Sequence, residues 1–167
     1  SQLLPAWIII LVITFKSGCY LLLFNQLIMA ATGVSVADSV VEEFAEFKKS
    51  SNKITFIVYK IDGPQIVTEH KSGEDESFDA FLALMPADDC RYALYKMDFT
   101  TNDGRPATKL ISIAWAPDTA KVKSKMIYAG SKDALTRVFV GVSVKVTATD
   151  MSELTKDICV DACKKFA

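Results

Sequence analysis

Apolar positions from residue 30 onward alternate between a helical and an extended period. Four of them recur at the i, i+1, i+4 and i+7 spacing of one helix face: Val40, Val41, Phe44 and Phe47. We expect Asp38 or Ser35 to cap this helix, because short polar side chains accept hydrogen bonds from the free amides of a first turn. The β-branched and aromatic run at 54–61 then predicts a strand, and the turn Asp62-Gly63-Pro64 predicts a hairpin with residues 66–70.

The same alternation continues to the end of the chain. We expect a long helix to open at Pro117 with Asp118 as its cap, and to loosen at Gly130 and Ser131. Further helices are predicted at 78–85, 131–139 and 155–166. Further strands are predicted at 91–100, 108–115 and 142–148. This order of elements predicts an α/β (α+β) fold, with a mixed sheet of about five strands and helices on both faces.

The first 29 residues differ from the rest, since they carry a single charge, Lys16. Two apolar runs, 6–15 and 19–24, lie on either side of it. Three interpretations stay open: a membrane anchor, a secretory signal without a basic start, or sequence that the mature protein lacks. We favour the third, and predict a hydrophobic N-terminal extension at 1–29 and one domain at 30–167.

Composition narrows the function classes. Half of the 167 residues are hydrophobic and 23% are charged, which favours a globular core over disorder. The net charge of −1 gives no basic field for nucleic-acid binding. One histidine and four scattered cysteines do not predict a zinc site, and we interpret the cysteines as reduced thiols of a cytoplasmic protein: Cys19, Cys90, Cys159 and Cys163.

Catalytic motifs are missing from the sequence. It has no phosphate-binding glycine loop, no nucleophile elbow and no His-Glu-x-x-His pair. We interpret His70 as a solvated or hydrogen-bonded residue, and the acidic runs at 74–76 and 88–89 as solvated helix ends. Cys159 and Cys163 stand at i, i+4 on a helix, where at least one should pack against the sheet. We therefore expect no enzyme, cofactor or metal site.

A basic and apolar stretch at 115–128 is the most informative part of the chain. On a helix, Lys121 and Lys125 share one face and Lys123 lies well round the axis, with Val122 and Met126 adjacent. Two interpretations remain: an ordinary solvated helix, or a binding helix that uses Met126 for apolar contact and its lysines for an acidic partner.

Several separate motifs then occur in the order typical of one family. They are Met29–Val34, Asp89–Ala93, Trp115–Asp118, Lys123–Tyr128 and Ser131–Leu135. Through these motifs residues 29–167 resemble the actin-depolymerising factor/cofilin family. The resemblance implies a mixed sheet between helices. It also implies a protein of the cytoplasm and cytoskeleton that binds actin monomers and filaments, severs filaments and promotes their disassembly and turnover.

The resemblance also implies two actin-binding surfaces. One, for monomers and filaments, would comprise Thr32, Gly33, Val34, Lys123, Lys125 and Met126. The other, for filaments alone, would comprise Lys109, Asp161 and Lys165. Ala107 and Ala162 depart from basic residues common in the family, although Arg105 and Lys164 stand nearby. We therefore expect monomer binding to be better retained than strong filament binding.

Two forms of regulation follow from the same resemblance. Thr32 stands near the position of a family phosphorylation site, with Ser35 close by, and phosphoinositides would compete for the basic helix. We expect a monomer. Alternatives are a monomer binder with weak severing, a debranching regulator of the actin-related branching complex, and a membrane-anchored adaptor.

Overall fold

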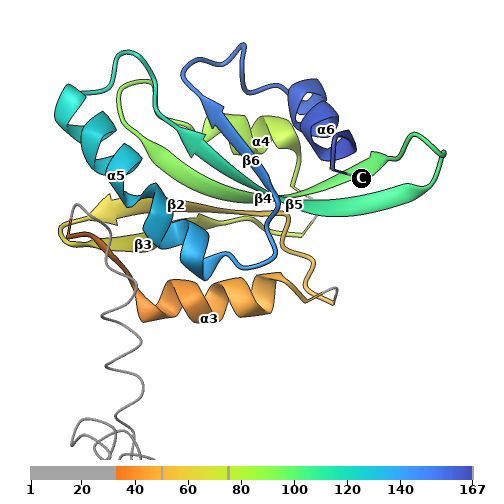
Figure 1. Ribbon diagram of the computed structural model, residues 1–167, viewed down its shortest axis with the longest axis horizontal. Helices are drawn as coiled ribbons and strands as arrows, with labels where there is room; N and C mark the ends of the chain where they lie inside the picture. The colour runs from red at the N-terminus through yellow and green to blue at the C-terminus, as the bar shows by residue number, and fades with distance from the viewer. Residues whose placement is uncertain (1–32, 50, 75, 167) are drawn as a thin grey trace, which may run out of the picture.

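The computed structural model describes residues 33–49, 51–74 and 76–166, and within them four helices and six strands alternate (Figure 1). The helices are α3 (Asp38–Phe47), α4 (Phe78–Ala83), α5 (Val122–Val138) and α6 (Lys156–Lys164). The strands are β1 (Ser35–Val36), β2 (Phe56–Asp62), β3 (Gln65–Lys71), β4 (Arg91–Thr100), β5 (Pro106–Trp115) and β6 (Val144–Ala148). The predicted extension at 1–29 lies outside the described residues.

One mixed sheet in the order β1-β3-β2-β4-β5-β6 forms the centre of the molecule. The four middle strands pair antiparallel, while β1 and β6 join the two edges in parallel. The predicted mixed sheet is therefore confirmed. Its sixth strand, β1, has only two residues, Ser35 and Val36, and so shows no alternation that a sequence pattern could reveal.

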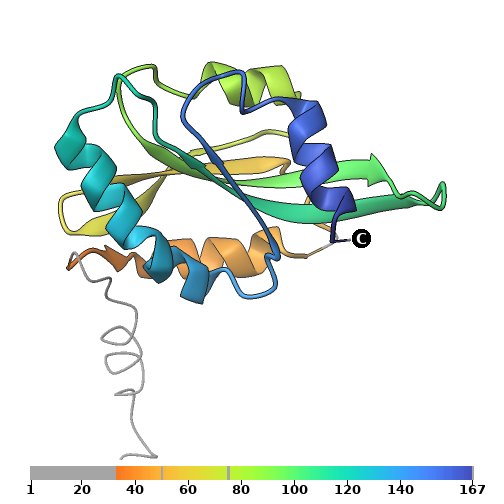
Figure 2. The ribbon, with the colours of Figure 1, turned by 45° about the horizontal axis from the view of Figure 1, so that its top comes forward.

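Helices cover both faces of this sheet, as Figure 2 shows. Strand β2 divides its side chains between the faces: Ile57 and Tyr59 join one core, and Phe56 and Val58 join the other. Helices α3 and α5 complete the first core, which we call the α3–α5 core. Helices α4 and α6 complete the second, the α4–α6 core. The domain is thus a sheet between two helical layers, each with its own buried apolar cluster.

Helix α5 begins and continues differently from the prediction. Residues 117–120 form a turn in which the Ala120 amide donates to the Pro117 carbonyl at 2.9 Å, so the helix begins only at Val122. Asp118 is consequently not its cap. The helix also runs unbroken through Gly130 and Ser131, and the buried Ser131 hydroxyl donates to the Ile127 carbonyl at 2.7 Å within it. Packing on the sheet outweighs the cost of one helical glycine, about 1 kcal/mol.

The predicted cap of α3 was also wrong. Its N-cap is Ala37, which makes no side-chain capping bond. Asp38 is the first helical residue, where its charge still favours the helix dipole, and Ser35 belongs to β1.

Candidate protein-binding surfaces

The first turns of α5 expose an apolar pair beside a lysine. Val122 is 71% exposed and Met126 is 67% exposed, and their i, i+4 spacing puts them on one side of the helix. Lys123 is exposed next to them. We call Val122, Lys123 and Met126 the α5 patch. Exposed apolar side chains of this size stand out on a surface and favour contact with a partner.

Lys125 has a local role beside the α5 patch. Its ammonium group lies 3.7 Å from the Asp118 carboxylate and donates to the Asp118 carbonyl at 3.2 Å. The side chain is one-third exposed, so it fastens the turn before α5 and still offers part of its charge to a partner. Lys121 is the N-cap and does not belong to the helix proper.

The N-terminal arm approaches α5 through β1, which contacts that helix. Gly33 is exposed and has a φ of 75°, a left-handed conformation that strains residues with a side chain. Val34 is only 5% exposed and packs in the α3–α5 core. Of the predicted arm contacts, Gly33 is therefore available at the surface, Val34 positions the arm, and Thr32 lies outside the described residues.

Two tyrosines hold α5 in place on the sheet. The Tyr128 hydroxyl accepts a hydrogen bond from the Ile61 amide at 2.9 Å, and the Tyr92 hydroxyl donates to the Tyr128 carbonyl. The two rings lie 4.9 Å apart. Burial raises the pKa of Tyr128, so its phenol stays neutral at ordinary pH. These hydrogen bonds fix the helix that carries the α5 patch. No short sequence motif predicts this positioning role of the two tyrosines.

Replacing Tyr128 with phenylalanine is expected to destabilise the protein by about 1–3 kcal/mol, because the Ile61 amide loses its partner. Urea unfolding of the full chain would measure the loss. Tyr95→Phe is the matched control, since no hydrogen bond of the Tyr95 hydroxyl occurs among the described residues. Equal stability of the two variants would contradict the anchoring role.

The β4–β5 hairpin and α6 form a second surface at the other end of the molecule (Figure 1). Asp161 and Lys165 are exposed on and just after α6, as is Arg105 on the hairpin. The Lys109 ammonium instead donates to the carbonyls of Cys163, at 3.5 Å, and Phe166. Lys109 thereby links the hairpin to the last turn of α6, a function that its predicted role as a contact did not include.

The two alanines that depart from the family pattern lie partly in the core. Ala107 and Ala162 are half-buried and pack against the α4–α6 core. The nearby Arg105 is exposed, and Lys164 is half-buried at the end of α6. The second surface therefore has fewer outward charges at these two positions than a basic pair would supply.

The groups considered for chemistry have ordinary structural surroundings. Cys159 and Cys163 are fully buried, and burial raises the pKa of Cys159 to about 11, which leaves its thiol protonated and unreactive at neutral pH. His70 stacks on Phe56 with 6.0 Å between ring centroids. Within the described ranges, no group of three or more metal-binding side chains is assembled, and no helix could span a membrane.

The fold, a mixed sheet between two helical layers, is that of an actin-binding class of protein, as comparisons with known proteins show. The chain belongs to the cofilin/tropomyosin-type actin-binding protein family, whose sequence model matches residues 33–164. It is 43% identical to actin-depolymerizing factor 7 of Arabidopsis thaliana over 77% of this chain and 93% of that protein. It is 40% identical to the cofilin of Yarrowia lipolytica, over 83% and 92% of the two chains. The crystal structure of Streptomyces griseoflavus cofilin superposes with a TM-score of 0.73 at 34% identity, covering 80% and 98%.

Proposed function

We propose that this protein binds actin monomers and filaments and promotes the severing, disassembly and turnover of filaments. Its family membership and its similarity to actin-depolymerizing factors support this function. The structural observation that carries the proposal is the pair of exposed apolar side chains, Val122 and Met126, beside Lys123 on a rigidly held helix. The protein acts through binding energy and not through catalysis.

The α5 patch would make the contact common to monomers and filaments. Met126 and Val122 lose water against an apolar cleft of actin, while Lys123 and Lys125 face acidic groups at its rim. Gly33 and Thr32 would extend the contact along the arm, which Val34 holds in the core. The flexible thioether of Met126 adapts to an irregular cleft.

The second surface would engage the neighbouring subunit of a filament through Asp161 and Lys165, with Arg105 nearby. If these contacts are stronger in one filament twist than in another, binding shifts the filament toward that twist and weakens its subunit contacts. Because Ala107 and Ala162 are packed inward, we expect filament binding to be weaker than monomer binding.

The decisive experiment is high-speed co-sedimentation of the full chain with actin filaments, with both fractions analysed. Protein in the pellet together with more actin in the supernatant supports a depolymerising factor. More supernatant actin without pelleted protein supports the alternative of a monomer binder with weak severing. No change in either fraction contradicts the proposal and favours the debranching alternative, which a branched-network assay would then test.

Replacing Lys109 with methionine is expected to weaken filament binding by about fivefold and to leave monomer binding unchanged. The methionine keeps the apolar stem but loses the positive charge and the donor that joins the hairpin to the Cys163 and Phe166 carbonyls; a fivefold loss of affinity corresponds to about 1 kcal/mol. Co-sedimentation and a monomer titration would measure the two affinities. Lys145→Met, on an exposed lysine of β6, is the control, and equal losses in both assays would contradict the assignment to the filament surface.

We further propose a cytoplasmic monomer whose α5 lysines attract phosphoinositide head groups in competition with actin. A phosphate on Thr32 would add about −1.5 to −2 charges to the N-terminal arm and repel acidic actin groups. Ser35 is the second candidate; its exposure is intermediate, and its hydroxyl donates to the Pro64 carbonyl at 3.5 Å.

The hydrophobic extension matters to this function, because an arm tethered at a membrane could not reach actin freely. We propose that the mature protein begins near Met29 or Ala30. Intact-mass analysis of native protein would decide: a mass that includes residues 1–28 contradicts the proposal. Persistence in membranes after a high-salt wash would then favour the membrane-anchored adaptor.

A further inference from the structure

Strand β6 forms one edge of the sheet, and its outer side carries unpaired main-chain groups. It pairs in parallel with β5, and Figure 1 shows it running between α5 and α6. The Ala148 carbonyl accepts from the Ala116 amide at 3.0 Å, so every second residue of β6, counted back from Ala148, directs its main-chain groups toward β5. The groups of Lys145 and Thr147 therefore point outward. In the parts of the chain that the structure describes, these amides and carbonyls have no hydrogen-bond partner.

An open edge of this kind is a template for another extended chain. A segment that joins a sheet edge gains main-chain hydrogen bonds, and pockets beside the edge select its side chains. Lys145 and Thr147 are both exposed, so a segment can approach them from solvent. The outer side of β6 therefore offers a docking position for an extended segment.

A small pocket lies beside this edge, on the α5 face of the sheet. Its volume is about 160 Å³, and its lining includes Ala114, Ala116, Ala129 and Thr147. The short side chains of the three alanines leave this space between α5 and the end of β5. An apolar cavity of roughly 150 Å³ holds a benzene ring, so this pocket has the size of one apolar side chain. Because Thr147 belongs to both the edge and the pocket, a segment paired with β6 would bring a side chain to it.

The charges around the edge favour an acidic partner. The Lys132 ammonium lines the pocket and donates to the Thr147 hydroxyl at 2.9 Å, which leaves its other N–H groups for a second acceptor. The exposed Lys145 side chain forms no ion pair or hydrogen bond within the described ranges. Lys125 also lines the pocket but is engaged by Asp118. No carboxylate occurs among the described residues of the lining, so a partner's carboxylates would meet complementary charge.

A second copy of the chain fits this edge less well than an acidic segment does. Two β6 edges paired with each other would bring lysines of both copies together, and like charges across a strand pair are destabilising. Exposed lysines on edge strands commonly protect a sheet against such self-pairing. The same charge attracts a segment that carries carboxylates.

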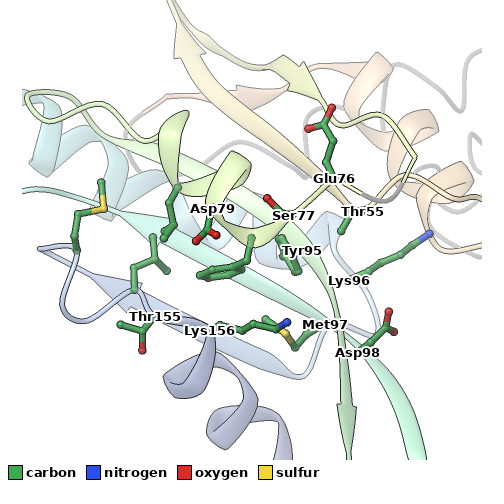
Figure 3. Close-up of a pocket in the computed structure, with 14 residues that line it drawn as sticks. Thr55, Glu76, Ser77, Asp79, Tyr95, Lys96, Met97, Asp98, Thr155 and Lys156 are labelled. Carbon is green, nitrogen blue, oxygen red and sulfur yellow. The ribbon is translucent and has the colours of Figure 1, made fainter.

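A larger pocket, of about 580 Å³, lies on the opposite face of the sheet between α4 and α6 (Figure 3). Two of its carboxylates already have partners in the domain, since the Gly73 amide donates to Glu76 at 2.8 Å and the Thr108 hydroxyl donates to Asp98. Its tyrosine, Tyr95, is only 6% exposed. This pocket therefore lacks the unpaired main-chain groups and the free lysine that distinguish the β6 edge.

We propose that the β6 edge and the pocket beside Thr147, together called the β6 groove, bind an extended acidic segment of a partner protein. The outward main-chain groups of Lys145 and Thr147 pair with the segment, and one apolar side chain enters the pocket. A carboxylate two positions away lies on the same face of the segment and reaches Lys145. Of the groups proposed to contact actin, only Lys125 lines the groove, so the site is separate from the α5 patch.

The test is a titration of the ¹⁵N-labelled full chain with acetyl-Thr-Glu-Thr-Leu-Thr-Glu-Thr-amide, followed by NMR. This peptide is palindromic, so it presents leucine to the pocket and glutamate to Lys145 in either strand direction. The Lys145 and Thr147 amide signals are expected to shift. At a peptide concentration of about ten times Kd, hydrogen exchange of these two amides should slow by about tenfold, because only the free fraction of the protein exchanges.

Three control peptides separate the contributions of the main chain, the apolar side chain and the charges. N-methylation of the leucine and the two threonines beside it removes the N–H donors and should weaken binding by about tenfold or more. Alanine in place of leucine should weaken binding by about tenfold, since the pocket stays unfilled. Glutamine in place of both glutamates should weaken it by about three- to fivefold.

Matched variants of the protein test the same contacts from the other side. Ala129→Leu fills the pocket from α5 and should weaken the leucine peptide by about tenfold but the alanine peptide by less than about twofold. Lys145→Gln should weaken the parent peptide by about three- to fivefold. Lys53→Gln, on an exposed lysine that pairs with Glu74, should not.

Several results would overturn the proposal. They are absence of shifts at millimolar peptide, equal binding of the leucine and alanine peptides, undiminished binding of the N-methylated peptide, and shifts without slower exchange at Lys145 and Thr147. Slow exchange of both amides in the concentrated free protein would assign the edge to a second copy and also overturn it. Co-sedimentation of Lys145→Gln with actin should match the unsubstituted chain, so failure of the β6 groove and failure of the actin proposal remain distinguishable.

Discussion

Replacing Met126 with alanine is expected to weaken binding to actin monomers and filaments alike by about tenfold, which corresponds to about 1.4 kcal/mol. Met126 is the longest apolar side chain of the α5 patch, and its 67% exposure leaves it without a role in the core. The loss should therefore appear in the affinity and not in the stability, where surface substitutions change the free energy of unfolding by about 0.5 kcal/mol at most. Titration of labelled actin monomers and filament co-sedimentation would measure the two affinities.

Val140→Ala provides the matched control for this substitution. Val140 is also 67% exposed, but it lies in the loop after α5, where its carbonyl accepts from the Lys48 ammonium at 2.9 Å. Removing its side chain deletes a similar apolar surface outside the α5 patch. If both variants bind actin equally well, the proposed contact of Met126 with actin is wrong. If Met126→Ala loses only filament binding, the patch belongs to the filament surface instead.

The sheet could be predicted from sequence because its strands carry their own signals. The run at 54–61 and the turn Asp62-Gly63-Pro64 gave the first hairpin, which the structure confirms as β2 and β3 with a tight turn between them. The predictions were wrong where packing between residues far apart in the sequence determines whether a helix continues. Gly130 does not interrupt α5, because the buried Ser131, Ala134 and Leu135 beyond it secure the helix to the core.

Some features of the candidate site could likewise be predicted from the sequence, and others depend on distant contacts. The spacing of Val122 and Met126 among lysines is visible in the sequence, and exposure in the structure agrees with it. Lys109 shows the limit, since its ammonium binds carbonyls 54 and 57 positions away, and no local pattern encodes such a partner. The burial of Val34 depends likewise on where β1 joins the sheet.

Replacing Phe56 with alanine should be the most destabilising single change considered, at about 3–5 kcal/mol. Phe56 is fully buried at the centre of the α4–α6 core. Its ring lies 5.3 Å from that of Phe81 and is stacked 5.9 Å from that of Tyr95. Because whole domains are stable by only about 5–15 kcal/mol, the melting temperature should fall by roughly 10 °C or more. Calorimetry of the full chain would measure it.

Phe166→Ala, on a phenylalanine that is 60% exposed, should melt close to the unsubstituted protein, and equal melting of the two variants would refute the assigned core. The position of Phe56 also separates stability from function. It lies on the face of the sheet opposite α5, whose patch rests on the other core through Tyr128. Below the melting transition, Phe56→Ala should therefore retain monomer affinity within about twofold, whereas Met126→Ala should lose it while melting normally. This crossed pattern would place actin binding on α5 without confusion from partial unfolding.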